Sequence, residues 1–228
     1  MSYQETRVFT LADNLHGALL IGANTLFSPL LRGWYNRWGA TAAELQRALP
    51  GDDLLPRPRQ AFTRAVTINA PPDRVWPWIA QIGQGRGALY SYELLENIAR
   101  CDMHNLNHID PALQHIQPGD RVRLGPEGYP VYKVHTVEPG RYLLLVGADP
   151  ATGAVPDLTQ NPAAYTFSTW LFYLEPDGRS RTRLIMRGLL DFAPPSFGFR
   201  LLWGVTEPIG FVMMRRMLIG IRQRAEAA

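Results

Sequence analysis

The segment TEPIGFVMMRRMLIGIRQRA, residues 206–225, decides the fold of this chain. Thr206 can cap a helix here, Glu207 suits its positive end, and Pro208 is tolerated in its first turn. Apolar residues then occupy almost every side, which is the pattern of a helix buried on most of its surface. At about 1.5 Å per residue, the stretch from Glu207 to Ala225 is roughly 28 Å long, enough to run the length of a β-sheet.

The region before this helix is typical of β-structure, with strand-like runs at 120–125, 131–137, 141–148, 166–175 and 179–192. The turn sequences Glu-Pro-Gly and Pro-Asp-Gly between neighbouring runs would join them as hairpins, so the sheet is antiparallel. In the last run the arginines share one side of the strand, and Leu184, Met186 and Leu190 share the other. We therefore expect one sheet face to be exposed or thinly covered and the other to face a core.

One further strand and two short helices are predicted upstream of these strands. Residues 62–69 alternate as a strand does. Residues 70–72, Ala-Pro-Pro, open a helix, because proline is tolerated where the backbone N–H groups lack partners anyway. The glycines in 83–87 end that helix with a tight turn, and Ser91 can cap a second helix. Because these glycines follow a helix and lack the G-x-G-x-x-G spacing, they are not a dinucleotide-binding loop.

This order of elements resembles that of the START/Bet v 1 superfamily. The stretch TINAPPDRVW, residues 67–76, is similar to the motif of its bacterial polyketide-cyclase-like members, and the sequence Pro-Gly-Arg at 139–141 adds to the likeness. The resemblance covers about residues 62–226. It implies an α+β helix-grip fold, in which a curved antiparallel sheet wraps around a long C-terminal helix with an apolar cavity between them. The superfamily includes carriers, receptors and enzymes, so the resemblance does not imply one reaction.

The resemblance also implies a seven-stranded sheet, whereas six strands can be counted from the sequence. A seventh would have to lie in 103–118 or 149–165. Residues 1–61 have no counterpart in the minimal fold. We therefore expect an N-terminal helical extension and linker over residues 1–61, followed by a helix-grip domain over residues 62–228.

Residues 8–38 of the extension predict a helix whose apolar stripe docks on the main domain. The residues of that stripe are Leu11, Leu15, Leu19, Leu26, Leu30, Trp34 and Trp38. Pro29 should kink or split the helix. Thr41 and Glu44 form a capping-box sequence that starts another helix, and an acidic, proline-rich linker follows over 52–61.

The stretch from Leu15 to Leu31 is apolar, and a membrane span is its alternative interpretation. It falls short of the roughly 20 residues that cross a bilayer, and it contains His16, Asn24 and Pro29. We expect residues 8–38 to pack on the domain or to make peripheral contact with a membrane surface.

Composition excludes several classes of protein. An apolar fraction of 46% with 19% charged residues indicates a packed globular chain. The net charge is +3, but the arginines are scattered, so we expect no nucleic-acid partner. Cys101 is the single cysteine, which precludes an intrachain disulfide. The N-terminal sequence lacks a signal-peptide pattern, and a cytoplasmic location is the expectation.

Metal binding and cofactor chemistry are not predicted. His104 and His108 stand four residues apart, with Cys101, Asp102, Asp110 and His115 nearby. Asparagine and proline in this stretch favour a loop, in which the histidines would not share one helical face. The sequence also has no G-x-S-x-G, H-E-x-x-H or Walker motif, and we expect no cofactor.

The leading hypothesis is a protein that binds or carries a small hydrophobic ligand, lipid-like or aromatic, between sheet and C-terminal helix. The residues assigned to the ligand cavity are Trp78, Tyr90, Tyr92, His104, Trp170, Phe172, Met186, Glu207, Met213 and Met217. The alternative is a cyclase or dehydratase whose polar groups move protons, with Tyr90, Tyr92, His104 and Glu207 as candidates. A third hypothesis is a membrane-associated protein anchored by residues 8–38. The ligand, any catalytic activity and the oligomeric state stay open.

Overall fold

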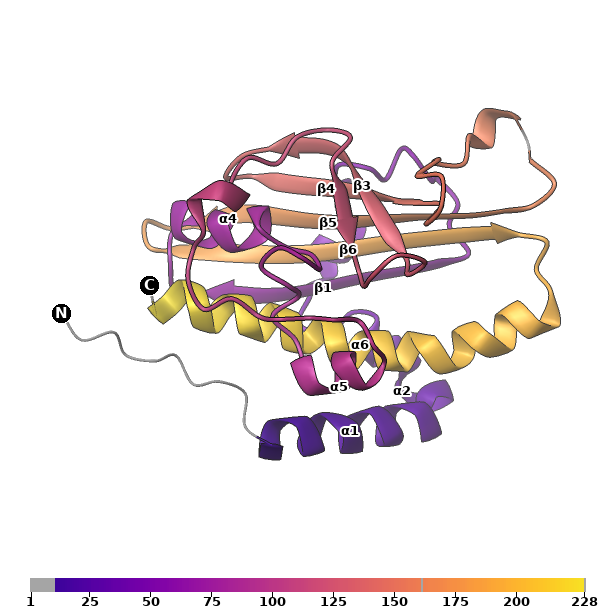
Figure 1. The fold of residues 1–228 in the computed structure, drawn as a ribbon, viewed down its shortest axis with the longest axis horizontal. Helices are drawn as coiled ribbons and strands as arrows, with labels where there is room; N and C mark the ends of the chain where they lie inside the picture. Colours follow the sequence, from indigo (N-terminus) through magenta and orange to yellow (C-terminus); the bar gives the residue numbers. More distant parts are fainter. Residues whose placement is uncertain (1–10, 161, 228) are drawn as a thin grey trace.

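The computed structural model describes residues 11–160 and 162–227, and it has the predicted helix-grip architecture (Figure 1). One antiparallel sheet has the strand order β1-β6-β5-β4-β3-β2. Its strands are β1 Gln60–Ile68, β2 Arg121–Arg123, β3 Val131–Glu138, β4 Tyr142–Ala148, β5 Tyr165–Asp177 and β6 Arg181–Ala193. The helices are α1 Leu11–Leu26, α2 Ser28–Tyr35, α3 Ala42–Gln46, α4 Pro72–Ala80, α5 Glu93–Ile98 and α6 Phe197–Ala227, with short 3-10 turns at Pro111–Leu113 and Leu158–Gln160.

The hairpins follow from their turn residues. Gly140, between β3 and β4, and Gly178, between β5 and β6, both have positive φ angles, of 77° and 74°. Glycine adopts this conformation without steric cost, as the turn sequences predict. Over the described residues the sheet has six strands. The segment 103–118 contains only a 3-10 turn, so it does not supply the seventh strand that the resemblance implies.

The inner face of the sheet carries the main core. Because side chains alternate along a strand, the even-numbered residues of β1, β5 and β6 point toward α6. Buried members of this core include Val66, Phe172, Leu184 and Met186, which pack with residues of α4 and α6. The helix α6 runs along this face, and α1 lies outside α6 in Figure 1, so the layers are sheet, long helix and outer helix.

The outer face differs from the sequence expectation, because it is well covered. The segment after α2 folds back over it, where Leu49 packs with Leu171 and Ile185. Arg187, whose side chain is 8% exposed, donates to Asp52 and to the carbonyl of Glu44. The Glu44 carboxylate also accepts from Arg183 at 2.7 Å. The row of arginines on β6 predicts an exposed face, which holds for Arg181 at the start of the strand. Arg183 and Arg187 instead have carboxylate and carbonyl partners on residues more than 100 positions away.

Two helix starts were predicted wrongly from cap sequences. The helix α6 begins at Phe197, well before Thr206, and the Thr206 hydroxyl donates to the carbonyl of Leu202 at 3.1 Å inside the helix. Threonine can satisfy its hydroxyl in this way as readily as it caps a helix. The Ser91 hydroxyl does not cap α5 either, because it donates to the carbonyl of Met213 at 3.0 Å.

The N-terminal extension has the predicted break, but the opposite face docks. Pro29 stands in the first turn of α2, after α1 ends at Leu26. Asn14 and Asn24 are buried, and Gly17 lies so close to Tyr92 that a Cβ would come within 2.8 Å of its ring. Most of the predicted docking stripe points outward instead, although Trp38 at its end packs against the core. Its leucines are exposed as follows: Leu11 68%, Leu15 59%, Leu19 74%, Leu26 74% and Leu30 83%.

This reversal has a physical reason, since periodicity shows which residues share a face but not which face touches the protein. Small and polar residues let α1 approach α6 closely. The capping box of α3 is present as predicted, with Glu44 N donating to Thr41 Oγ1 at 3.2 Å. Residues 8–10 of the predicted helix lie outside the described residues. Among the described helices, none combines the length and hydropathy of a bilayer span.

Candidate ligand-binding cavity

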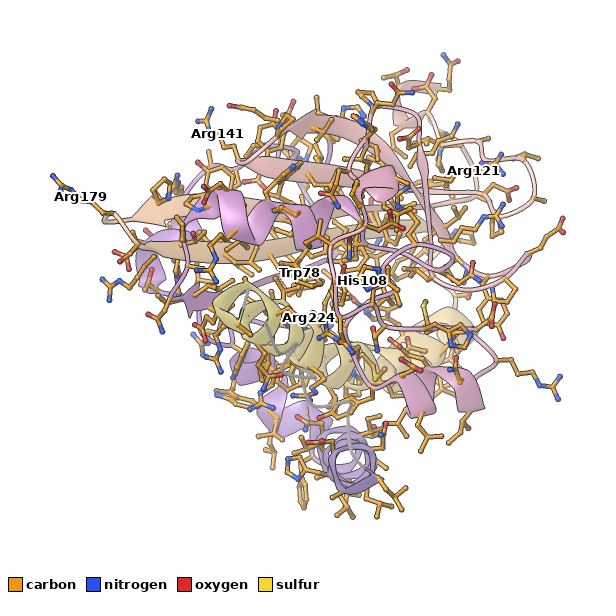
Figure 2. The ribbon with its side chains drawn as sticks, turned by 60° about the vertical axis from the view of Figure 1, so that its left-hand side comes forward. Trp78, His108, Arg121, Arg141, Arg179 and Arg224 are labelled. Carbon is orange, nitrogen blue, oxygen red and sulfur yellow. The ribbon has the colours of Figure 1, made fainter. Side chains whose placement is uncertain are left out.

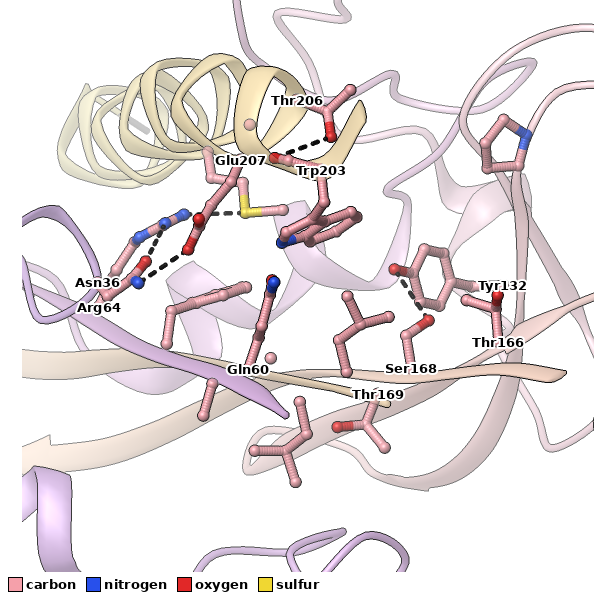
Figure 3. Close-up of a pocket in the computed structure, with 18 of the residues that line it drawn as sticks. Asn36, Gln60, Arg64, Tyr132, Thr166, Ser168, Thr169, Trp203, Thr206 and Glu207 are labelled. Carbon is pink, nitrogen blue, oxygen red and sulfur yellow. Dashed lines mark hydrogen bonds between the residues drawn. The ribbon is translucent and has the colours of Figure 1, made fainter. Parts of the chain in front are cut away.

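A cavity of about 470 Å³ lies between the first half of α6 and the neighbouring ends of β1, β5 and β6 (Figure 3). Its lining residues from α6 are Leu202, Trp203, Thr206, Glu207, Gly210 and Met214. The sheet contributes Gln60, Ala61, Phe62, Arg64, Thr166, Ser168, Thr169, Gly188, Leu189 and Leu190, and Asn36, Pro130 and Tyr132 complete the wall. The volume falls in the range of about 300–1,000 Å³ that is usual for small-molecule sites.

The cavity continues the core along the same strands, and glycines help to keep it open. A Cβ at Gly188 would overlap the Phe62 ring, so the absence of a side chain on β6 lets that ring lie flat on the sheet. Gly210 on α6 has no atom within 4 Å of its would-be Cβ. At the inner end, the Tyr132 ring lies 5.5 Å from the Trp170 ring, which in turn lies 4.8 Å from Phe172. This aromatic row joins the cavity wall to the solid core.

Arg64 forms the polar end of the cavity. It is 1% exposed, and its guanidinium lies between the rings of Phe62 and Phe211, at 4.2 and 5.0 Å from their centroids. Its Nε donates to the carbonyl of Tyr35 at 2.9 Å, and Nη1 lies 3.1 Å from the sulfur of Met214. Burial lowers the pKa of Arg64 to about 9, although the nearby Glu207 acts in the opposite direction.

Glu207 lies beside Arg64 but interacts with other groups. Its side chain is 10% exposed and accepts from the Asn36 amide at 2.9 Å. The Nε of Arg32 lies 3.0 Å from the second oxygen of the carboxylate. The oxygen of the same Asn36 amide accepts from Arg64 Nη2 at 3.4 Å. Figure 3 shows Asn36, Arg64 and Glu207 together at one end of the cavity. The carboxylate of Glu207 is therefore largely neutralised from the α2 side.

Hydroxyl and amide groups line the sheet side of the cavity. Tyr132 and Ser168 have their hydroxyl oxygens 3.5 Å apart, and burial raises the pKa of Tyr132. The Oε1 atom of Gln60 is buried without a hydrogen-bond partner among the described residues. The site thus combines apolar walls with a few polar groups that a ligand can satisfy, which is the usual composition of a small-molecule pocket.

The structure distributes the sequence-predicted cavity residues over several places. Glu207 lines the cavity. In the solid core lie Trp78, Tyr90, Trp170, Phe172, Met186 and Met217. Tyr92 and Met213 pack in a separate cluster beneath α1 and α2. His104 lies on the surface with its side chain 74% exposed, and its ring contacts Asp102 at 3.1 Å. Tyr90, Tyr92, His104 and Glu207, the candidates for proton transfer, are therefore not brought together.

The lining residues that sequence reasoning missed lie mainly on α6, β1, β5 and β6, and those on β1 carried a readable signal. Phe62 and Arg64 precede Val66 and Ile68 at even positions, so alternation alone places an arginine on the core-facing side of a strand. A charged residue at such a position is rarely buried without a role in pairing or binding, and this was the available signal. The histidine-rich stretch belongs to no group of three or more metal-ligating side chains within the described residues.

Comparisons with known proteins give only distant likenesses. No family model matches the chain, and no curated protein matches it. Among solved structures, protein MLL2253 from Mesorhizobium loti is 17% identical, with a TM-score of 0.39 over 74% of this chain and 98% of that chain. CalU16 from Micromonospora echinospora is 15% identical, with a TM-score of 0.33 over 73% of this chain and 84% of that chain.

DynU16, described as a putative protein in the dynemicin biosynthetic locus, is 18% identical, with a TM-score of 0.34 over 69% of this chain and 47% of that chain. Similarity at this level carries no argument about function. The helix-grip fold is therefore assigned from the strand order and from the packing of α6 against the sheet.

Proposed function

We propose that this protein binds and carries a small hydrophobic ligand in the cavity between α6 and the sheet. The observation that carries the proposal is a cavity of about 470 Å³ between α6 and the sheet, with apolar walls and charged groups at one end. Apolar surface of the ligand buried against Phe62, Leu190 and Met214 would supply most of the affinity, at about 25 cal/mol per Å². This function requires no cofactor.

Binding is favoured over a cyclase or dehydratase activity by the arrangement of titratable groups. Within the cavity these are Arg64, Tyr132 and Glu207. The carboxylate of Glu207 is already engaged by Arg32 and Asn36. Burial raises the pKa of Tyr132, so its hydroxyl is not poised to act as a base near neutral pH. A polyketide-cyclase-like activity would need a freer acid or base facing the substrate.

The test is a substitution that fills the cavity from α6. Gly210→Leu places a side chain in open space and replaces a helical glycine with a better helix former, so folding should be preserved. Binding of Nile red, a neutral hydrophobic dye, should weaken at least about tenfold, a change of roughly 1.4 kcal/mol. Gly198→Leu, on the same helix but outside the cavity, is the matched control.

If Gly210→Leu binds the dye as tightly as the unmodified protein does, the dye site lies elsewhere and the proposal fails. Native mass spectrometry of freshly purified protein provides a second measurement. We expect a co-purified hydrophobic compound with the unmodified protein and less of it with Gly210→Leu.

A second candidate function, peripheral membrane contact through residues 8–38, is favoured by the outward leucine stripe of α1 and α2. Exposed apolar surface of this extent on a helix pair is typical of an interaction surface. Trp34 is 51% exposed, and Arg32 and Arg37 are also exposed, which fits the headgroup region of an anionic bilayer. Leu202 is both 60% exposed and part of the cavity wall, so apolar surface reaches the cavity mouth.

Co-sedimentation with vesicles of phosphatidylcholine and phosphatidylglycerol tests this second function. The double variant Leu19→Gln with Leu30→Gln should lose most of the vesicle binding. Size-exclusion chromatography at the same protein concentration separates the alternatives. Self-association that is lost in the variant, without vesicle binding by the unmodified protein, would assign the stripe to a second copy of the chain.

A further inference from the structure

Arg64 is a buried cation whose guanidinium is in direct contact with no carboxylate of the described residues, although Glu207 lies nearby. Among the described residues, none places a carboxylate oxygen within 4.0 Å of its guanidinium. Its contacts are a backbone carbonyl, a thioether sulfur, an amide oxygen at 3.4 Å and the faces of two aromatic rings. These neutral acceptors orient the guanidinium but leave its charge only partly compensated.

The nearby charges do not supply the missing anion. Glu207 is the acidic residue of the cavity wall, and it is in contact with Arg32 and Asn36. Counted together, Arg32, Arg64 and Glu207 give this end of the cavity one net positive charge. Burying a charge without a counterion is costly, so a cavity of this kind favours a ligand that brings a negative charge.

We propose that Arg64 binds the carboxylate of an amphipathic ligand, such as a medium-chain fatty acid, whose hydrocarbon tail lies along the apolar wall of the cavity. This inference rests on the proposed binding function and specifies its ligand class. A guanidinium suits a carboxylate because its N–H groups form a planar fork that matches the two oxygens. The Gln60 amide, which extends into the cavity in Figure 3, can donate an additional hydrogen bond to the same head group.

The remaining wall fits the tail. Phe62, Leu190, Leu202 and Met214 line the space between Arg64 and the exposed side of α6, and no acidic side chain other than Glu207 lines the cavity. A carboxylate at Arg64 would thus leave the hydrocarbon chain against apolar groups. Among the described residues that line this cavity, Arg64 is the one charged base, which favours a ligand with one negatively charged end.

The experiment compares two ligands that differ only in the head group. Decanoate and decanol have the same chain length, and each is titrated against protein loaded with Nile red. Decanoate should displace the dye at a concentration roughly tenfold to a hundredfold lower than decanol does, the range of one charge-assisted hydrogen-bonded pair. In Arg64→Met the two ligands should become nearly equal, while decanol binding is retained.

The matched control is Arg183→Met, which removes an arginine of the same sheet from the opposite face, where it pairs with Glu44. Its preference for decanoate should equal that of the unmodified protein. Arg64→Lys, which retains a charge without the planar fork, should lie between the two extremes. Circular dichroism of each variant identifies any that fails to fold, and in that case the ratio in the unmodified protein still decides.

The outcomes separate this inference from the proposed function. Equal displacement by decanoate and decanol in the unmodified protein would overturn the role of Arg64 and leave a hydrophobic cavity. Failure of both ligands to displace the dye would overturn the binding function itself. A preference for decanoate that persists in Arg64→Met would place the head group at another residue.

Discussion

The two halves of α6 cover the same sheet face, but the space between helix and sheet is filled with side chains beneath one half and is a cavity beneath the other. The C-terminal half, with Met217, Leu218 and Ile221, packs solidly against the strands and α4. The N-terminal half covers the cavity. In Figure 2, Trp78 lies between α4 and α6, where its side chain helps to fill the space. Among the described helices, α4 contacts both α6 and the strands β5 and β6, and it does so beside the second half of α6, where the interior is solid.

The buried arginines of the two halves show the same contrast. Arg224 donates to the carbonyls of Leu106 and Gly220 and to the Asn107 side chain, at 2.8–3.2 Å. Arg64 has one carbonyl partner and weaker acceptors. Burial lowers both pKa values, to about 10 for Arg224 and about 9 for Arg64. Arg224, in the solid half, donates its hydrogen bonds to groups of the protein. Arg64, in the hollow half, has fewer strong acceptors, which agrees with the proposal that it binds a ligand.

The largest expected effect is a difference in unfolding free energy between a side-chain truncation in the solid half and one in the hollow half. Phe172→Ala removes a fully buried ring from the solid half and should cost about 3–5 kcal/mol of unfolding free energy. Leu190 borders the cavity and has fewer packing contacts to lose, so Leu190→Ala should cost about 2 kcal/mol, the low end for such a truncation. Urea denaturation measures both. Equal costs would mean that the cavity wall is packed as tightly as the core.

A buried acid gives a second test of how burial shifts a pKa, here upward instead of downward. Glu96 on α5 is buried, its carboxylate oxygens have no hydrogen-bond partner among the described residues, and its pKa is raised to about 8 by burial and by the neighbouring Glu93. Between pH 4.5 and 8 the unfolded chain ionises Glu96 while the folded chain keeps it protonated. Stability should therefore fall as pH rises through this window.

Replacing this acid with Glu96→Gln should remove that pH dependence. At pH 8 the variant should be more stable than the unmodified protein, by on the order of 3 kcal/mol, and at pH 4.5 the two should be similar. Thermal or urea unfolding at several pH values measures the difference. A stability that rises from pH 4.5 to 8 in the unmodified protein, and not in Glu96→Gln, would contradict the assigned shift.

A smaller effect is expected where the sheet meets the cavity. Gly188→Ala introduces a methyl group that collides with the Phe62 ring, which must move into the cavity. The cost should be about 1–2 kcal/mol, together with weaker Nile red binding. Gly22→Ala on α1, where a Cβ would have no atom within 4 Å, is a control away from the cavity. Unchanged dye affinity in Gly188→Ala would show that Phe62 does not define the cavity.

The smallest effect on stability should come from the outer helices. Leu19→Gln and Leu30→Gln alter side chains that are 74% and 83% exposed, so each should change the unfolding free energy by less than about 0.5 kcal/mol. The same substitutions are the ones expected to reduce vesicle binding. A loss of more than about 2 kcal/mol in either variant would show that the leucine packs against the protein in solution.

Most of the fold could be predicted because its signals are local. Alternation identified the strands, Gly140 and Gly178 marked the hairpins, and the apolar segment around Met217 indicated a buried helix. The cap at Thr206 failed because a threonine hydroxyl has a second way to bond, to a carbonyl one turn earlier. Where a threonine could either cap a helix or bond to a carbonyl within it, tertiary packing decides between the two.

Much less of the candidate site could be predicted. Met213 and Met217 were chosen for their chemistry, but Met214, one residue away from Met213, lines the cavity. A shift of one residue rotates a helical side chain by about 100°, which sequence periodicity does not resolve for a helix that is apolar all round. Arg64 was overlooked for a different reason, since its partners on α2 and α6 lie far along the chain.

The sequence by itself determined the strand order along the chain, the hairpin turns and the presence of a long buried helix, because each depends on the conformational preferences of neighbouring residues. Only the tertiary structure decided which face of α1 docks, which arginines are paired and where the interior stays hollow. These properties depend on the volumes and charges of side chains that come together from distant segments, and the conformational preferences of neighbouring residues do not encode them.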